Sequence, residues 1–178
     1  MRAFTGIDLP DQIKESIAGA QARLAGNGIV PVNKAHLHIT MHFFPQISDG
    51  QAAKVINAID TQNLSEFEVE VKGVSYFGGS DVRVVYAGVE DPEGSIKTIY
   101  DQISSELSKN SVPFDVKGAY LPHVTIARSK SRNPYLRQFI ADNLNYEFGR
   151  FAVKGIFFKK SVLTQKGPVY TDLYERQI

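Results

Sequence analysis

The most constraining feature of this chain is a four-residue motif, His-apolar-Thr-apolar, that occurs twice. The first copy, His38-Ile39-Thr40-Met41, lies in "HLHITMHFF", and the second, His123-Val124-Thr125-Ile126, lies in "LPHVTIAR". The two histidines are 85 positions apart (123 minus 38), which is about half of the 178 residues. An internally duplicated fold with one copy in each half explains this spacing.

Both stretches alternate as β-strands do, so residues two apart share a face. His38 and Thr40 therefore point the same way, and Leu37, Ile39, Met41 and Phe43 are expected to point into the core. His123 and Thr125 share a face of the second strand in the same manner. If the two strands face each other, two imidazoles and two hydroxyls surround one cleft.

The rest of the chain predicts four helices and several further strands. The first helix follows Pro10 and ends at Gly26-Asn27-Gly28, and the second follows a capping box formed by Ser48 and Gln51. The third carries apolar residues on one face from Ile96 to Leu107, and the fourth begins at Pro134.

Stretches such as "FEVEVKGV" and "VRVVYAGV" read as strands between these helices, in an irregular order with tight turns. We therefore expect an α+β fold with two similar lobes of antiparallel or mixed sheet. The helices lie outside, the active-site cleft lies between the lobes, and residues 1–178 form a single domain.

Composition limits the function classes. The formal net charge is +1, which excludes sequence-independent binding of nucleic acid over a broad surface. The chain has no cysteine, so thiolate nucleophiles and cysteine-bound metals are excluded. The start, "MRAFTGIDLP", lacks a signal-peptide core, so we expect a cytoplasmic protein without membrane contact. No exposed apolar stripe requires a protein partner, which favours a monomer.

Two imidazoles beside two hydroxyls suit phosphodiester chemistry. A neutral imidazole takes a proton from water and an imidazolium gives one to a leaving oxygen, both near neutral pH. Threonine hydroxyls donate to the phosphate oxygens, where charge is redistributed in the transition state.

A rival hypothesis is a metal site. His36, His38 and His42 have the same strand parity, so they could hold zinc as a three-histidine hydrolase does. Another alternative is a nucleotide- or RNA-binding module with little catalysis.

The two motifs and their order resemble the 2H (two-histidine) phosphoesterase superfamily, in particular its RNA 2',3'-cyclic phosphodiesterases, also known as 2'-5' RNA ligases. Further similar segments are "RAFTGIDLP", "VYAGVEDPEG" and the closing "SVLTQKGPVYTDLYE". His36 and Pro45 depart from the family pattern, which usually has Asn and Gly there.

The resemblance implies metal-free hydrolysis of a 2',3'-cyclic phosphate on RNA 3' ends or nucleotides to a 2'-phosphate, with no cofactor. His38 would be the proton donor to the leaving 3' oxygen and His123 the proton acceptor from water, while Thr40 and Thr125 hold the phosphate. The reverse reaction would be 2'-5' RNA ligation.

Four further residues are candidates for substrate contact: His42, Arg128, Tyr120 and Phe44. Arg128 has the wrong parity for the cleft in a regular strand and reaches phosphate only if the strand bends or ends at Ala127; the alternative is a solvated arginine at the end of the strand. Tyr120 or Phe44 would stack on a base, and core packing is the favoured role of Phe44.

Overall fold

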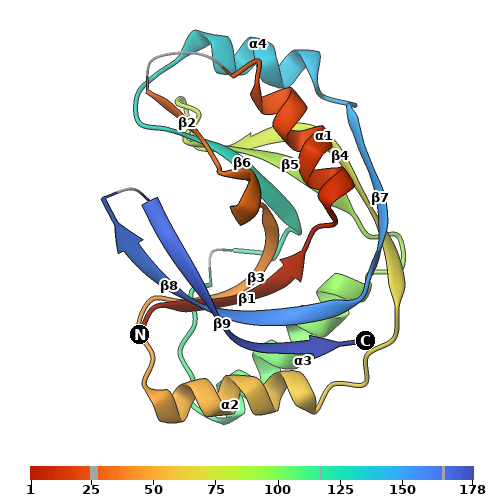
Figure 1. Ribbon diagram of the computed structural model, residues 1–178, viewed down its shortest axis with the longest axis vertical. Helices are drawn as coiled ribbons and strands as arrows, with labels where there is room; N and C mark the ends of the chain where they lie inside the picture. Colours follow the sequence, from red (N-terminus) through yellow and green to blue (C-terminus); the bar gives the residue numbers. More distant parts are fainter. Residues whose placement is uncertain (25–27, 117, 166) are drawn as a thin grey trace.

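The computed structural model describes residues 1–24, 28–116, 118–165 and 167–178. Its centre is one strongly curved sheet of nine strands, in the order β7-β4-β5-β6-β3-β1-β8-β9 with β2 paired to β6 (Figure 1). Every described strand pair is antiparallel. The predicted α+β class is confirmed. Of the two kinds of sheet that were predicted, antiparallel and mixed, the described strands form an antiparallel one.

The two motif strands lie side by side in the middle of the sheet and divide it into two lobes. The His38 lobe contains β3 (His38–Phe44), β1 (Ala3–Asp8), β8 (Gly155–Thr164) and β9 (Gly167–Gln177). The His123 lobe contains β6 (His123–Ser129), β5 (Val84–Glu90), β4 (Phe67–Phe77), β7 (Glu147–Val153) and β2 (Ile29–Pro31). At the boundary between the lobes, β3 pairs with β6 through Ile39 and Val124.

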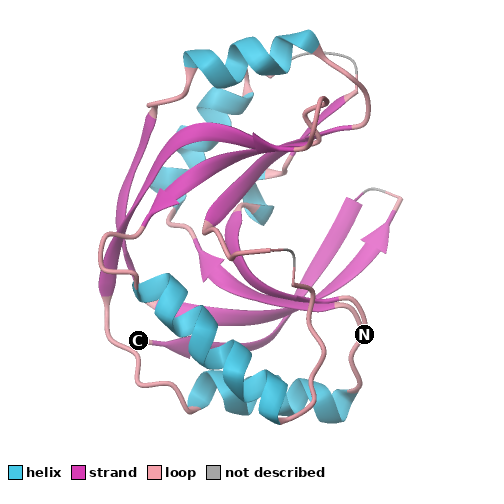
Figure 2. Ribbon diagram, turned by 180° about the vertical axis from the view of Figure 1, so that it is seen from behind, coloured by secondary structure: helices cyan, strands magenta, loops and turns pink. Residues whose placement is uncertain are grey.

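Each lobe is covered by two helices, which lie outside the curved sheet (Figure 2). The helices α1 (Asp11–Gln21) and α4 (Pro134–Asp142) pack on the His123 lobe, and α2 (Asp49–Asp60) and α3 (Ser95–Lys109) on the His38 lobe. One of the two helices on each lobe follows a strand of the other lobe. The helix α1 follows β1 of the His38 lobe and packs on the His123 lobe, and α3 follows β5 of the His123 lobe and packs on the His38 lobe. This exchange ties the two halves together.

Local sequence signals account for the helices. The capping box of Ser48 and Gln51 is present at the start of α2, and Pro134 is the first residue of α4. The predicted apolar face of α3 is buried. The predicted stop at Gly26-Asn27-Gly28 falls largely outside the described residues; α1 itself ends at Gln21. Within the described ranges, no helix combines the length and apolarity needed to span a membrane.

Candidate active site

A cleft runs along the concave side of the sheet where the two motif strands meet. It consists of two adjoining cavities of about 330 and 480 Å³, called here the His38 side and the His123 side. The residues that line both cavities are Thr40, Phe43, Thr125 and Arg128. The structure therefore brings both His-x-Thr pairs to one cleft.

A β-bulge in β3 sets which side chains reach this cleft. Phe4 of β1 pairs with Phe43, whereas Gly6 pairs with Thr40, so β3 has one extra residue between the two pairs. Such a bulge reverses the alternation of side chains beyond it. Phe43 consequently faces the cleft, and the prediction that it points into the core is wrong.

The same bulge turns Phe44 away from the cleft. Phe44 is 0% exposed and its ring packs edge-on against Phe158. Of the two roles considered for Phe44, the favoured one, core packing, is therefore confirmed, and stacking on a base is not, because the bulge gives that position on the cleft wall to Phe43.

A second bulge occurs at the matching place in β6. Val85 of β5 pairs with Ala127 and Tyr86 pairs with Thr125, so β6 also has one extra residue beyond its threonine. Arg128 therefore lines the cleft despite its odd distance from His123. Phe43 and Arg128 thus occupy equivalent positions, each three residues after the threonine of its motif.

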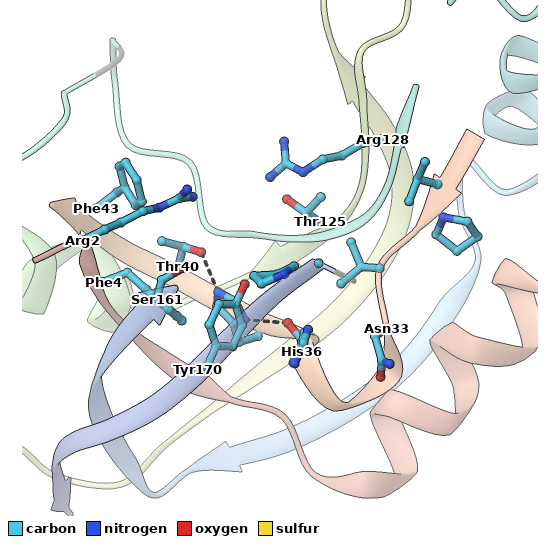
Figure 3. A pocket seen from close by; sticks show the side chains of 16 residues that line it. Arg2, Phe4, Asn33, His36, Thr40, Phe43, Thr125, Arg128, Ser161 and Tyr170 are labelled. Carbon is cyan, nitrogen blue, oxygen red and sulfur yellow. Dashed lines mark hydrogen bonds between the residues drawn. The ribbon is translucent and has the colours of Figure 1, made fainter. Parts of the chain in front are cut away.

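Both imidazoles are held by the same kind of hydrogen bond, from Nδ1 to the backbone carbonyl oxygen two residues earlier. Nδ1 of His38 donates to the carbonyl oxygen of His36 at 2.7 Å, and Nδ1 of His123 donates to that of Leu121 at 2.8 Å. Because a carbonyl can only accept, Nδ1 carries the hydrogen in both rings, and Nε2 is the nitrogen that gains or loses a proton. Nε2 of His38 lies 3.0 Å from Oγ1 of Thr40, which donates to it when the ring is neutral (Figure 3).

Aromatic surroundings keep both rings neutral. His38 stacks on Phe4 with a centroid distance of 4.8 Å, and burial lowers its pKa to about 4. His123 contacts the edges of Phe77 and Tyr86, and burial, with a smaller effect of Arg128, lowers its pKa as well. At neutral pH both histidines therefore carry a free lone pair on Nε2, and an anion in the cleft favours their protonation.

His42 lies beneath the cleft, not in it. It is 0% exposed, its Nδ1 lies 3.0 Å from Oγ1 of Thr5, and its Nε2 lies 2.9 Å from Oγ of Ser104. Its ring stacks on Tyr100 at 4.5 Å, and burial lowers its pKa to about 3. The prediction that His42 contacts substrate is wrong, since the bulge in β3 turns its side chain inward.

The same placement removes the basis of the three-histidine metal site. That hypothesis needed His36, His38 and His42 on one face, but His36 belongs to the short 3-10 helix η1 (Lys34–His36) and His42 is turned inward and hydrogen-bonded. In the described part of the chain, no three His, Cys, Asp or Glu side chains are grouped so that they could hold a metal ion.

Tyr120 lines the His123 side of the cleft, but its polar end is already engaged. Its hydroxyl donates to the carbonyl oxygen of Thr40 at 3.1 Å, and its ring stacks on Tyr100 with a centroid distance of 4.0 Å. Burial raises the pKa of its hydroxyl. Tyr120 thus fixes the backbone of β3 at Thr40, and that role was missed by the sequence interpretation.

Three more residues on the His38 side were not predicted: Arg2, Ser161 and Tyr170. Ser161 and Tyr170 belong to the closing hairpin of β8 and β9, whose similarity to a family segment was the only signal for them. Arg2 precedes β1 and begins the similar segment "RAFTGIDLP", which gave no indication of a role in the cleft. Long-range pairing of β1 with β8 brings the three together.

Comparison with known proteins agrees with this site. The family model of the 2'-5' RNA ligase superfamily matches residues 9–161. The chain belongs to the 2'-5' RNA ligase superfamily. This membership confirms the predicted resemblance to the two-histidine phosphoesterases.

Relatives in this superfamily match nearly the full chain. The RNA 2',3'-cyclic phosphodiesterase of Methanocaldococcus jannaschii is 32% identical over 178 residues, 98% of this chain and 99% of that protein. The enzyme of the same name from Archaeoglobus fulgidus is 29% identical over 175 residues, 97% of this chain and 98% of that protein. The predicted enzyme class, a hydrolase of phosphodiester bonds, is confirmed by these relatives.

Solved structures confirm the fold. TT0787 of Thermus thermophilus superposes with a TM-score of 0.86 at 24% identity, covering 99% of this chain and 97% of that chain. LigT of E. coli, solved in complex with 3'-AMP, superposes with a TM-score of 0.81 at 21% identity, with coverage of 99% and 97%.

Proposed function

We propose that this protein hydrolyses the 2',3'-cyclic phosphate at RNA 3' ends, or on nucleotides, to a 2'-phosphomonoester without a metal ion. The observation that carries the proposal is the convergence of both His-x-Thr pairs on one cleft, each with Nε2 as its titrating nitrogen. The name shared by relatives from several organisms supports the substrate class.

In this reaction the cyclic phosphate lies between Thr40 and Thr125, which border both sides of the cleft. The two hydroxyls and the guanidinium of Arg128 donate to the non-bridging oxygens, whose charge is redistributed in the transition state. The guanidinium suits a phosphate because its planar fork matches two oxygens at once.

The two histidines transfer the protons. Nε2 of His123 takes a proton from water, the water oxygen bonds to phosphorus, and the bond from phosphorus to O3' breaks. His38 donates the proton on its Nε2 to O3', leaving the phosphate on O2'. Exchange with solvent then returns His123 to the neutral form and His38 to the protonated form, so the net reaction consumes one water.

The low pKa of His38 fits a proton donor that is charged only when substrate is bound. In the free protein burial keeps the ring neutral, with a pKa of about 4. The negative charge of a cyclic phosphate nearby favours the imidazolium and raises that pKa. Substrate binding therefore favours the protonation of His38, and this proton is the one that the leaving oxygen accepts.

The same site can join two RNA ends. If a 5'-hydroxyl of a second RNA end takes the place of water, His123 removes its proton and its oxygen bonds to phosphorus. The bond from phosphorus to O3' breaks, His38 donates a proton to O3', and a 2'-5' linkage remains. This outcome requires the second end at a high effective concentration, since water competes at all times.

The test is product analysis with chelator-treated protein. We expect adenosine 2',3'-cyclic phosphate and a short RNA with the same terminus to give 2'-phosphates only. A 3'-phosphate product, or activity that is lost on chelation and restored by zinc, would contradict the mechanism. Saturable binding without turnover across acidic, neutral and alkaline pH would instead favour a binding module.

A further inference from the structure

We propose that Arg2, together with Ser161, binds a second phosphate: the one on O5' of the nucleoside whose cyclic phosphate is hydrolysed. The inference rests on the proposed function and adds a specificity-determining contact to it. This contact makes the protein prefer RNA ends over cyclic mononucleosides that lack a 5' phosphate.

The first observation is the state of Arg2 itself. Its Nε is buried and has no hydrogen-bond partner among the residues that the structure describes. Its guanidinium lies over the ring of Phe43, with Cζ 4.8 Å from the ring centroid. A buried arginine N–H without a partner is rare in folded proteins, so the state of Arg2 requires a functional explanation. Figure 3 shows Arg2 and Arg128 reaching from opposite sides toward the space above Thr40 and Thr125.

The second observation is an excess of positive charge. The described residues that line the His38 side include Arg2 and Arg128 but no Asp or Glu. The hydroxyl of Tyr170, on the same side, lies within the field of Arg2, Arg128 and Lys159: burial raises its pKa, and all three cations act in the opposite direction. A 2',3'-cyclic phosphate carries one negative charge, and Lys159 already pairs with Asp8 and Asp172, so the two arginines suit a substrate with a further phosphate.

The third observation is position along the strands. Thr40 pairs with Gly6, and Phe43 pairs with Phe4, two residues nearer to Arg2. At about 3.3 Å per residue the backbone of Arg2 lies roughly 13 Å from that of Gly6, beyond the ring of Phe43. Arg2 thus enters the cleft from the Phe43 end of the strands, with its guanidinium over the ring of Phe43 and beside the phosphate held at Thr40 and Thr125, and the next anionic group of the substrate lies on O5'.

Ser161 supplies a second donor at the same place. Its backbone N–H donates to the carbonyl oxygen of Arg2 at 2.9 Å, and its side chain lines the His38 side of the cleft. His38, as donor to O3', fixes the ribose on this side, so the O5' substituent extends along it. A guanidinium and a neighbouring hydroxyl are donors of the kind that bind phosphates elsewhere.

The experiment compares three substrates: adenosine 2',3'-cyclic phosphate, the same compound with a 5' phosphate, and the dinucleotide ApA ending in a 2',3'-cyclic phosphate. Arg2→Gln should lower kcat/KM about tenfold or more on the two substrates with a phosphate on O5', mainly through KM, and less than about twofold on the first. Arg150→Gln is the matched control, since Arg150 pairs with Glu70 on the sheet edge outside the cleft and should change none of the three.

Comparing substrates within one variant cancels any loss of folded protein. An equal loss on all three substrates would overturn the inference, because Arg2 would then serve the reacting phosphate or the fold. Sensitivity confined to ApA would also overturn it, since the contact would lie on the upstream nucleoside. If the wild type turned over none of them, the proposed function itself would fail, and this inference with it.

Discussion

The two halves of the cleft are built alike but buried differently. Each has a histidine whose Nδ1 donates to the carbonyl oxygen two residues before it, and each has a bulge beyond the threonine. His38, however, is packed among Phe4, Phe157 and Tyr170, whereas His123 borders the larger cavity. Duplication therefore supplies two imidazoles in equivalent positions, and the packing around them makes their surroundings unequal.

The bulge positions show the same principle. Phe43 and Arg128 are equivalent in their strands, yet one brings an aromatic face to the cleft and the other a guanidinium. The shared backbone geometry aims both side chains at the same space. The residue type then decides whether the position packs against a substrate or binds its charge.

The largest expected effect tests whether the two histidines are both required. His38→Ala and His123→Ala should each lower kcat at least about 1,000-fold, since each removes a proton-transfer group. The double variant should be scarcely worse than either single variant, because the two act as a unit. Circular dichroism and thermal unfolding serve as the control for the fold. Substantial turnover in either single variant would show that the two histidines are not both required.

The next effect compares the two bulge positions. Arg128→Gln should lower kcat/KM about 10- to 100-fold, because a charge-assisted hydrogen bond to phosphate is lost. Phe43→Leu should cost less than about tenfold, since only ring contact is removed. Steady-state kinetics on one cyclic nucleotide measures both. Equal losses would mean that the two positions serve the same purpose despite their chemistry.

The pH dependence follows from the unequal burial. Burial lowers the pKa of His38 to about 4 and that of His123 below its usual range. In the free enzyme His38 must be protonated and His123 neutral, so kcat/KM should peak at acidic pH and decline toward neutral pH. The kcat profile should shift to higher pH, because bound phosphate favours both imidazolium ions. A kcat/KM profile that rises steadily through neutral into alkaline pH would contradict this assignment.

The smallest effect concerns the histidine that is not in the cleft. Burial lowers the pKa of His42 to about 3, below the value of about 6.5 in an unfolded chain. Between these values the unfolded state binds more protons, so His42 contributes stability that is complete above about pH 6.5 and is lost as the pH falls toward about 3. His42→Gln should reduce this slope by about 1 kcal/mol per pH unit in urea unfolding. An unchanged slope would mean that the histidine is hydrated in the folded protein.

Much of the fold was accessible from the sequence because its signals are local. The capping box before α2, the apolar face of α3 and Pro134 at the start of α4 each depend on residues a few positions apart. The repeated motif added the long-range information that the two halves correspond. The placement of His38 and Thr40 on one face followed from strand alternation alone.

Strand alternation failed beyond the threonines because a bulge depends on the neighbouring strand. The extra residue in β3 is defined by its pairing with β1, and the one in β6 by its pairing with β5. Neither bulge is accompanied by a glycine in its motif strand, so the sequence gives no local indication of it. The side chains of His42 and Phe43 were therefore assigned to the wrong faces, and those of Phe44 and Arg128 were left open.

The most direct test of the account is a substrate that needs no proton donor. In a cyclic phosphorothiolate with sulfur in place of the bridging O3', the leaving thiolate is stable without protonation, as a thiol has a pKa of about 8.5. We predict that His38→Ala hydrolyses this compound at a rate close to that of the wild type, while His123→Ala stays inactive. Rescue of His123→Ala instead, with His38→Ala inactive, would contradict the assigned roles and exchange the two halves of the cleft.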